Sequence, residues 1–349
     1  MREAIYALWK RLAGRFTGHR KHGTPPDQAK RSRVVRERMR QVILSIPHYF
    51  RELGRIRKPS ELYGWVYFKF PNSFPLAGFP PYLSVDVTNK CNFSCKHCWR
   101  TARPRPVGSM DVGLFEKIVR EVNLHRSFHR AFKLASGGEP ALHPHFRELM
   151  EISARYEMPT LVYTNGTLLQ SFSHREILNW RLDTVVVSVD GVDADSYERF
   201  KTGGNYASLR RAVMDFYQCR RTLGCRTPVV EIRHVIVASE TVTQLLQFRR
   251  VWLETADTVK FNYLEPATGL YDFEDPSRPK CRAIRREMGI WWDGTVPLCS
   301  GYRHEHLGNV RRSTISELWR HPKIEYMRQC HDRRDFAQVP VCLRCRKCN

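Results

Sequence analysis

The sequence predicts an α/β protein built from parallel βα units, with a basic helical segment before them and a cysteine-rich region after them. Three observations predict this. The 349 residues are 42% hydrophobic and 11% aromatic, which is enough for a sizeable core. Between residues 81 and 265, β-rich runs alternate with longer helical stretches, and the 11 cysteines gather at short spacings. We therefore expect an N-terminal extension over residues 1–80, a core over 81–265 and a small C-terminal domain over 266–349.

The N-terminal extension carries two amphipathic helical patterns, separated by a break at residues 23–27 that contains a Pro-Pro pair. The second pattern covers residues 33–50. The first places apolar residues at the three-and-four spacing of a helix face: Ile5, Leu8, Trp9, Leu12 and Phe16. We expect these helices either to dock on the next domain or to bind an anionic membrane surface or partner, which attracts Lys and Arg.

The chain is strongly basic, with a net charge of +23 and a pI near 9.9. About half of the excess lies in the first 60 residues, which hold about 16 Lys and Arg against about 4 Asp and Glu. This charge excludes an acidic solvating protein and indicates an anionic partner, such as nucleic acid, a lipid surface or an acidic peptide. No apolar run reaches the roughly 18 to 20 residues of a membrane span, and no secretory segment is present. We expect a cytoplasmic protein, with peripheral membrane association as a finer alternative.

Six candidate strands follow one another in the core, at residues 82–87, 131–135, 160–163, 184–189, 229–237 and 258–264. A loop with Gly, Asn or Asp and then a helical stretch follows each strand. This alternation predicts a parallel sheet, whether it closes as a barrel or stays open. In both cases the functional loops lie at the carboxyl ends of the strands.

Cys91, Cys95 and Cys98 follow the first strand as a C-x3-C-x2-C arrangement. Disulfides are disfavoured in a reducing compartment, whereas closely spaced thiolates bind soft metals or iron-sulfur clusters. Three thiolates can hold three irons of a 4Fe-4S cluster and leave the fourth iron open for a substrate or cofactor. A zinc site is the alternative. We interpret Cys219, Cys225 and Cys330 as ordinary buried residues.

Further motifs end the next three strands in order. Ser136-Gly137-Gly138-Glu139-Pro140 follows the second strand, Thr164-Asn165-Gly166 the third, and Ser188-Val189-Asp190-Gly191 the fourth. Glycines let a backbone approach a ligand closely, and a carboxylate pairs with an ammonium group. Asn-Gly and Asp-Gly are also common turn dipeptides. With the cysteine triplet, this order resembles the radical S-adenosylmethionine (radical SAM) superfamily.

The resemblance implies a partial (β/α)6 TIM-like barrel over residues 81–265. It implies that the triplet holds a SAM-binding 4Fe-4S cluster and that Asn165, Ser188 and Asp190 line the SAM pocket. The segment Gly137, Gly138, Glu139 and Pro140 would receive the methionine amino group, and Arg199 or Lys201 would hold the SAM carboxylate. His97 stands where relatives often have an aromatic residue, which bears on the packing of the adenine.

The implied chemistry is reductive cleavage of SAM to a 5′-deoxyadenosyl radical, which abstracts hydrogen from a substrate carbon. The cofactor performs the difficult step, and the protein supplies orientation and excludes solvent. A reductant such as flavodoxin or ferredoxin would deliver the electron.

The C-terminal region carries a second cysteine set. Cys281 precedes an alternating hairpin pattern at 291–296 around Asp293-Gly294, and Cys299 follows it. A T-x-x-E capping box at 314–317 begins a helix, and Cys342, Cys345 and Cys348 come near the end of the sequence. This spacing resembles the SPASM and twitch domains of radical SAM enzymes. It implies one auxiliary 4Fe-4S cluster held by Cys281, Cys299, Cys342 and Cys345, with Cys348 as a competing ligand and zinc as the alternative metal.

Relatives with such domains modify ribosomal peptides or proteins by crosslinking, epimerising or oxidising side chains, and we expect such a substrate here. Three alternatives stay open: a dehydrogenase or epimerase of an aminocyclitol or sugar, an RNA-modifying enzyme, and a non-catalytic iron-sulfur protein. No RNA-binding motif stands out, so nucleic acid is the weaker partner.

Overall fold

A computed structural model describes residues 66–67, 70–98, 100, 105–125, 131–135, 137–236, 240–263, 280–300, 305–343 and 345. They lie in one compact unit, Leu44–Asn349. Both expected amphipathic helices of the N-terminal extension lie outside the described residues. Among the described residues, no helix is long and apolar enough to cross a membrane.

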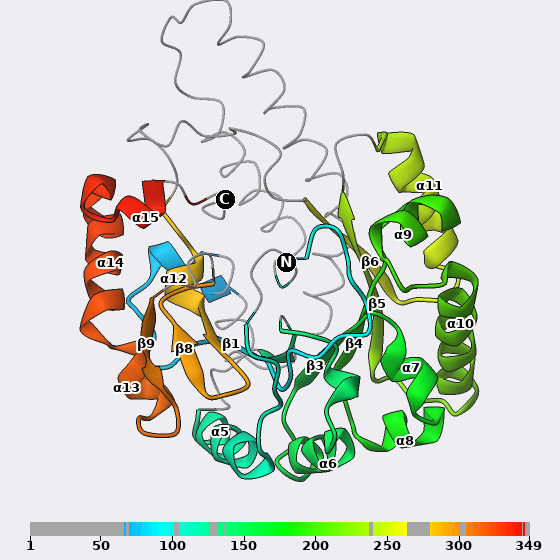
Figure 1. The fold of residues 1–349 in the computed structure, drawn as a ribbon, viewed down its shortest axis with the longest axis horizontal. Coiled ribbons are helices and arrows are strands. Elements are labelled where there is room, and N and C mark those ends of the chain that lie inside the picture. Colours follow the sequence, from blue (N-terminus) through cyan, green and yellow to red (C-terminus); the bar gives the residue numbers. More distant parts are fainter. Residues whose placement is uncertain are drawn as a thin grey trace, which may run out of the picture. The chain divides into compact units, whose positions relative to one another are not determined.

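A seven-stranded sheet of parallel strands forms the centre of this unit (Figure 1). Its order is β6-β5-β4-β3-β2-β1-β7. All six predicted strands are confirmed, with bounds that differ by one or two residues: β1 (Tyr82–Val85), β2 (Ala131–Leu134), β3 (Thr160–Thr164), β4 (Thr184–Ser188), β5 (Val229–Ile236) and β6 (Thr258–Tyr263). Each pairs in parallel with the next along the chain, as consecutive βα units require.

Helices pack along the outer side of the sheet (Figure 1). They are α5 (Val112–Leu124), α6 (Phe146–Arg155), α7 (Thr167–Ser171), α8 (His174–Asn179), α9 (Ala194–Phe200), α10 (Tyr206–Thr222) and α11 (Val242–Trp252). Several begin at a side-chain cap, such as Asp111 on α5 and the Thr241–Gln244 capping box on α11. Short 3-10 helices lie at η1 (Pro71–Ser73), η2 (Pro140–Leu142) and η3 (Phe336–Gln338).

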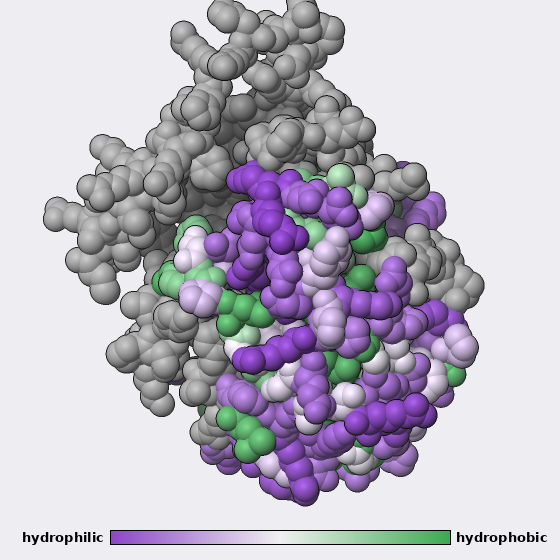
Figure 2. Space-filling view, turned by 90° about the vertical axis from the view of Figure 1, so that its left-hand side faces the viewer, coloured by the Kyte–Doolittle hydropathy of each residue, from purple (hydrophilic) through white to green (hydrophobic). Residues whose placement is uncertain are grey.

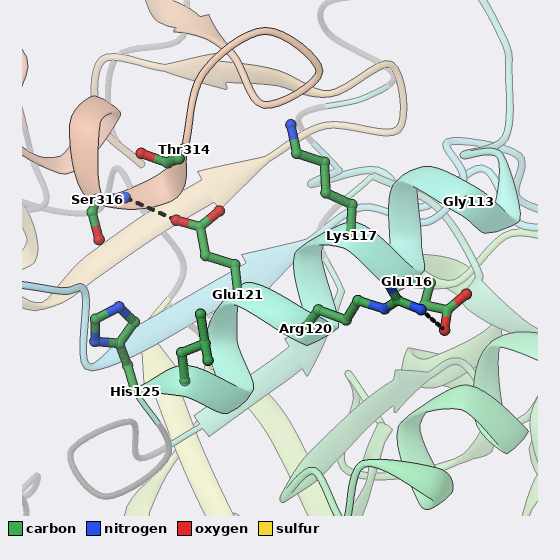
Figure 3. A pocket seen from close by; sticks show the side chains of 9 residues that line it. Gly113, Glu116, Lys117, Arg120, Glu121, His125, Thr314 and Ser316 are labelled. Carbon is green, nitrogen blue, oxygen red and sulfur yellow. Dashed lines mark hydrogen bonds and ion pairs between the residues drawn. The ribbon is translucent and has the colours of Figure 1, made fainter.

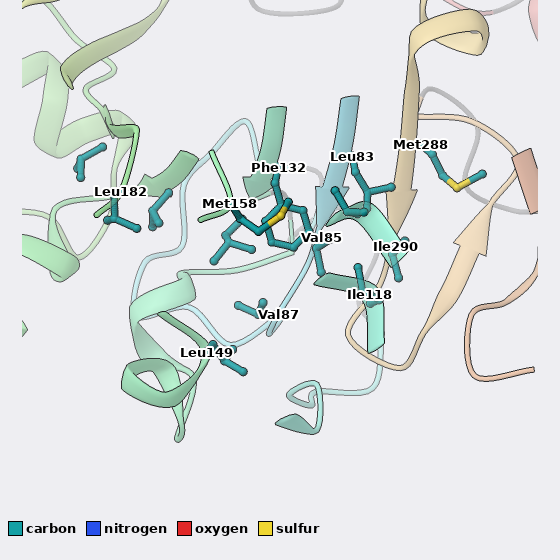
Figure 4. Packing of buried hydrophobic residues seen from close by; sticks show 14 of the residues in the cluster. Leu83, Val85, Val87, Ile118, Phe132, Leu149, Met158, Leu182, Met288 and Ile290 are labelled. Atoms are coloured by element: carbon teal, nitrogen blue, oxygen red, sulfur yellow. The ribbon is translucent and has the colours of Figure 1, made fainter. Parts of the chain in front are cut away.

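Alternate strand residues point to opposite faces of the sheet, so one set packs under the helices. Leu83, Val85 and Phe132 belong to this buried set, together with Ile118 of α5 and Leu149 of α6 (Figure 4). The other set, which includes Lys133, Tyr163 and Arg233, lies outside this hydrophobic cluster. The inner face of the sheet is therefore free to carry polar groups.

The C-terminal region contributes a strand that the sequence did not predict. β7 (Glu287–Ile290) follows α12 (Ala283–Arg286) and pairs in parallel with β1. Met288 and Ile290 of β7 join the same hydrophobic cluster as Leu83 (Figure 4). The expected turn at Asp293-Gly294 is present, but Trp291 is not part of a strand, and its backbone N–H donates to the Thr295 carbonyl.

After this turn, β8 (Thr295–Pro297) pairs with β9 (His306–Asn309) in a two-stranded antiparallel sheet. Three helices follow: α13 (Ile315–Trp319), α14 (Pro322–Arg333) and α15 (Pro340–Leu343). The predicted capping box of Thr314 and Glu317 starts α13, as expected. On the face that bears these helices, hydrophilic residues prevail and hydrophobic ones are scattered among them, which is ordinary for a protein surface (Figure 2).

Candidate functional site

The loop that carries Cys91, Cys95 and Cys98 follows β1 and is fixed by backbone hydrogen bonds. The backbone N–H groups of Ser94 and Lys96 donate to the carbonyls of Thr202 and Phe200, at 3.0 and 3.1 Å. All three thiols are partly accessible, and burial raises the pKa of Cys91 and Cys95. The end of α9 and the residues just after it therefore hold the cysteine loop in place.

The Gly-Gly-Glu segment after β2 lies directly against the start of this loop. The backbone N–H of Glu139 donates to the Lys90 carbonyl at 2.8 Å. A Cβ atom on Gly138 would stand 2.1 Å from that same carbonyl oxygen, so only glycine permits the approach. This contact brings the ends of β1 and β2 together.

The Glu139 carboxylate is buried and bonded to the end of β3. It accepts hydrogen bonds from the Thr164 hydroxyl at 2.9 Å and from the Asn165 backbone N–H at 2.7 Å. Burial outweighs these hydrogen bonds and raises the pKa of Glu139 to about 7. Glu139 thus positions the end of β3, and its expected contact with a methionine amino group stays a prediction.

Asn165 connects β3 to the cysteine loop. Its side-chain NH2 donates to Asn92 Oδ1 at 2.9 Å and lies 3.9 Å from Cys91 Sγ, while its Oδ1 accepts from the Thr167 hydroxyl at 2.7 Å. Asn92 in turn donates to Thr167 Oγ1 at 3.0 Å. This network orients the first cysteine relative to the strand end.

Asp190, after β4, is the centre of a buried ionic cluster. Its Oδ2 lies 2.7 Å from Lys201 Nζ and 3.1 Å from His97 Nε2, and its Oδ1 accepts from the Val235 backbone N–H at 2.9 Å. Burial opposes ionisation, but Lys201 and His97 outweigh it and hold the pKa of Asp190 well below its usual range. Lys201 also donates to Ser188 Oγ at 2.7 Å.

This ionic cluster gives His97 and Lys201 contacts that the sequence did not predict. His97 lies against Asp190, so the cysteine loop is also tied to the end of β4. The Lys201 ammonium is buried and satisfied by Asp190 and Ser188. Its expected contact with a SAM carboxylate therefore stays a prediction, as does that of Arg199.

Two of the expected auxiliary ligands, Cys281 and Cys342, meet through His331 of α14. The Cys281 backbone N–H donates to His331 Nδ1 at 3.1 Å, and His331 Nε2 lies 3.4 Å from Cys342 Sγ. Cys299 follows β8, and Cys299 and Cys345 pack against the same core as Cys281 and Cys342. Cys348 lies outside the described residues.

The three remaining cysteines differ from one another. Cys330 is fully buried, as expected. Cys219 and Cys225 are only half-buried, because they lie near and just beyond the exposed end of α10, so the interpretation of these two as core residues is wrong.

The donor sets fit iron-sulfur clusters in their chemistry: all seven expected ligands are soft thiols, three of them on one loop and four in or against one core. Among the residues that the structure describes, no three His, Cys, Asp or Glu side chains are arranged to hold a single metal ion. Sequence reasoning missed Asn92 and His331, which position cysteines. Asn92 lies within the triplet and could have been noticed there, whereas His331 sits in a helix without a motif.

A separate pocket of 570 Å³ lies on the outer side, where α5 approaches the start of α13 (Figure 3). Its lining includes Glu116, Lys117 and Glu121, and the Ser316 backbone N–H donates to Glu121 Oε1 at 3.2 Å. None of the predicted site residues lines it.

Comparison with known families bears on both cysteine sets. Residues 85–241 match the radical SAM superfamily, and residues 281–348 match SPASM, an iron-sulfur cluster-binding domain. These two ranges contain all the expected ligands.

Individual relatives are distant. A Pyrococcus furiosus protein described as a tungsten-containing aldehyde ferredoxin oxidoreductase cofactor-modifying protein is 22% identical over 298 residues, which cover 71% of this chain and 83% of that protein. The antilisterial bacteriocin subtilosin biosynthesis protein AlbA of Bacillus subtilis is 25% identical over 146 residues, which cover 41% of this chain and only 31% of AlbA.

Solved structures share the fold. Streptococcus suis SuiB, bound to S-adenosylmethionine, superposes with a TM-score of 0.59 at 16% identity, covering 77% of this chain and 71% of SuiB. The protein anSMEcpe with bound AdoMet gives a TM-score of 0.55 at 17% identity, covering 72% of this chain and 83% of anSMEcpe. The predicted α/β fold with a C-terminal cluster domain is confirmed. The chain belongs to the radical SAM superfamily of enzymes, with a 4Fe-4S cluster and S-adenosylmethionine as cofactors and a C-terminal SPASM domain for an auxiliary iron-sulfur cluster.

Proposed function

We propose that this enzyme cleaves S-adenosylmethionine reductively at the Cys91–Cys98 loop and abstracts hydrogen from a peptide or protein substrate. One observation carries the location: the loop with three thiols is bonded to the ends of β2, β3 and β4 at once, through Lys90, Asn165 and His97. Thiols at fixed positions beside three strand ends suit a cofactor site in a βα fold.

Residues at those strand ends have distinct tasks in this proposal. Cys91, Cys95 and Cys98 hold the cluster, and Gly137 and Gly138 leave room for the methionine part of SAM. At Gly137, a Cβ would stand 2.8 Å from the Asp86 carboxyl group, so this backbone also lies close to β1. When bound, the cluster supplies the electron that breaks the carbon-sulfur bond of SAM.

Glu139 and Asp190 act by positioning. Glu139 fixes the Asn165 backbone, and Asp190 holds His97 and Lys201 in one buried cluster. Both carboxylates keep the strand ends rigid, so that the reacting groups stay aligned and water stays out.

A peptide or protein substrate is supported by relatives. The AlbA protein is a bacteriocin biosynthesis protein, MftC of Mycobacterium ulcerans is a mycofactocin maturase, and SuiB has been crystallised with its precursor peptide SuiA. The matches cover 31% of AlbA and 36% of MftC, so the shared part is mainly the core. A reductant such as flavodoxin or ferredoxin is part of the proposal, and so is a single auxiliary cluster on Cys281, Cys299, Cys342 and Cys345.

The cofactor part is tested with anaerobically reconstituted protein, dithionite and SAM. We expect 5′-deoxyadenosine from the wild type and none from Cys95→Ala. Cys225→Ala, which removes a thiol outside both sets, should retain the activity. A Cys95→Ala protein that still forms 5′-deoxyadenosine would exclude the triplet as the cluster site.

The auxiliary site is tested by iron content. Cys281→Ala should lower bound iron by about four atoms per chain and keep the first cluster. Unchanged iron would exclude Cys281 as a ligand.

The substrate part is tested with peptides encoded beside the gene. We expect a peptide to lose two mass units, or to exchange hydrogen with deuterated solvent, in step with 5′-deoxyadenosine formation. If an aminocyclitol or sugar stimulates turnover and no peptide does, the peptide assignment fails.

A further inference from the structure

The inner face of the sheet carries a group of positive charges that the cofactor site does not use. Lys133 lies on β2, Arg233 on β5 and Lys260 on β6, with Tyr163 of β3 between the first two. Their neighbours Phe132 and Ile232 pack under the helices. Since side chains alternate along a strand, Lys133 and Arg233 point to the other face.

Most of these charges are held by fixed contacts. Arg233 forms an ion pair with Glu231, and Lys260 Nζ lies 2.7 Å from the other oxygen of that carboxylate. Arg233 Nη1 also donates to the Tyr163 hydroxyl at 2.7 Å. Burial opposes ionisation of Tyr163, but Arg233 and Lys133 outweigh it and lower the pKa of its phenol.

Lys133 differs from the other two cations. Its ammonium lies over the rings of Tyr163 and Tyr82, with 4.6 and 5.7 Å from Nζ to the ring centroids. Within the described part of the chain it forms neither an ion pair nor a hydrogen bond. The two aromatic faces therefore fix the position of a cation whose three N–H groups remain available.

Among the residues that the structure describes, the cluster is unbalanced in charge: three cations, Lys133, Arg233 and Lys260, face one carboxylate, that of Glu231. Glu287 lies near Tyr82, but it is paired with Arg286, so this pair adds no net charge. Arg233 and Lys260 are only 21% and 24% exposed, which makes an uncompensated charge costly. A bound anion would compensate it.

The charges also lie beside the proposed cofactor site. Arg233 is the ladder partner of Ser188, whose hydroxyl contacts Lys201. Tyr163 lies two residues before Asn165, which follows the end of β3, so their backbones are at most about 7 Å apart. A molecule bound at Lys133 and Arg233 would thus lie within reach of the Cys91–Cys98 loop.

We propose that Lys133, with Arg233 beside it, binds an oxyanion of the substrate, either a carboxylate or a phosphate group, on the inner face of the sheet. The inference rests on the proposed function, because it specifies the substrate of that same site. An acidic side chain or the carboxyl end of a peptide has this chemistry, and so has a phosphorylated small molecule. Charge-assisted hydrogen bonds from two cations would set the orientation of the substrate.

Lys133 is the residue to change, because in the described part of the structure no carboxylate is paired with it that its loss would leave unpaired. The test uses anaerobically reconstituted full-length protein saturated with SAM, in a buffer without carboxylates or phosphate. Glutarate and inorganic phosphate are titrated separately and followed by calorimetry. We compare wild type with Lys133→Gln, with the charge-conserving Lys133→Arg, and with Lys323→Gln, which changes an exposed lysine elsewhere.

We expect the wild type and Lys323→Gln to bind either glutarate or phosphate, with equal affinity. Lys133→Gln should bind the same anion at least about tenfold more weakly. Lys133→Arg should restore most of the affinity. Tighter binding of glutarate supports a carboxylate substrate, and tighter binding of phosphate supports a phosphorylated one. No binding, or equal binding by wild type and Lys133→Gln, overturns the proposal. So does a tenfold loss of SAM affinity in Lys133→Gln, which would assign Lys133 to the cofactor.

The oxyanion site and the proposed cleavage of SAM can be refuted independently of each other. Wild-type protein that forms 5′-deoxyadenosine but shows no Lys133-dependent binding refutes only the oxyanion site. Protein that binds the probe through Lys133 but forms no 5′-deoxyadenosine supports the oxyanion site and refutes the proposed reaction.

Discussion

His331 Nε2 donates a hydrogen bond to Cys342 Sγ, at 3.4 Å. The direction follows from the other side of the ring, since Nδ1 accepts the backbone N–H of Cys281 at 3.1 Å and Nε2 must then carry the proton. One buried histidine thus joins two expected cluster ligands and directs a donor at one sulfur.

His331→Leu removes this donor. Hydrogen bonds to cluster sulfurs stabilise the reduced, more negative state, so the midpoint potential of the auxiliary cluster should fall by about 40 mV. A redox titration followed by electron paramagnetic resonance measures this, with His145→Leu on the exposed start of α6 as control. An unchanged potential in His331→Leu would show that Cys342 is not a ligand of that cluster or that the hydrogen bond does not form.

Gly138→Ala should prevent the close approach of the Gly-Gly-Glu segment to the cysteine loop. The added Cβ would stand 2.1 Å from the Lys90 carbonyl, and backbone on both sides would have to move. We expect SAM affinity to fall at least about a hundredfold, as measured by equilibrium dialysis. Gly113→Ala in α5, where the nearest atom would be 3.5 Å away, should bind SAM normally and be slightly more stable. Equal SAM binding by both variants would refute this role of Gly138.

Glu139 should make the protein less stable as the pH rises. Its pKa is about 7 in the folded protein against 4.5 ordinarily, so the folded state holds a proton that the unfolded chain has lost. The free energy of unfolding should therefore fall by about 3 kcal/mol between pH 4.5 and pH 7 and level off above.

Urea unfolding of SAM-free protein at several pH values measures this slope. It should be smaller in Glu139→Gln and unchanged in Glu151→Gln, which alters an exposed residue of α6. The same slope in the Glu139→Gln protein would speak against a raised pKa.

Asp190→Asn leaves Lys201 buried without its carboxylate. Loss of one partner from a buried ion pair costs about 3 to 5 kcal/mol, and His97 in the cysteine loop loses its contact as well. Glu305→Gln, which breaks the exposed pair with Lys323, should cost less than about 1 kcal/mol. Denaturant titration compares the two. The double variant Asp190→Asn/Lys201→Met should recover part of the loss, and similar costs for both single variants would contradict the buried pairing.

The six core strands could be predicted because each is a compact β-rich run, such as Thr184–Ser188, followed by turn residues. β7 could not. Its four residues include Gly289 and resemble no strand by composition, and their partner β1 lies about 200 positions earlier in the chain. Pairing over that distance depends on the whole fold.

The site shows the same division. The Cys91–Cys98 triplet and the Gly-Gly-Glu segment could be proposed as site residues from the sequence because their spacing is local. The contact between His97 and Asp190 and the role of His331 depend on which loops meet. In the sequence, Lys133 cannot be distinguished from any other lysine in a strand. Its place on the inner face follows only because its neighbours Phe132 and Leu134 pack under the helices.

The parallel ladder between β7 and β1 has a practical consequence for dissecting this enzyme. A fragment that stops at residue 265 would leave the backbone donors and acceptors on one side of β1 unpaired. Unpaired edge strands of this kind form hydrogen bonds with strands of other molecules. Truncation there should give aggregates rather than an isolated catalytic half. Chimaeras that exchange the carboxyl-terminal part with a relative must keep Glu287–Ile290 together with its native neighbour.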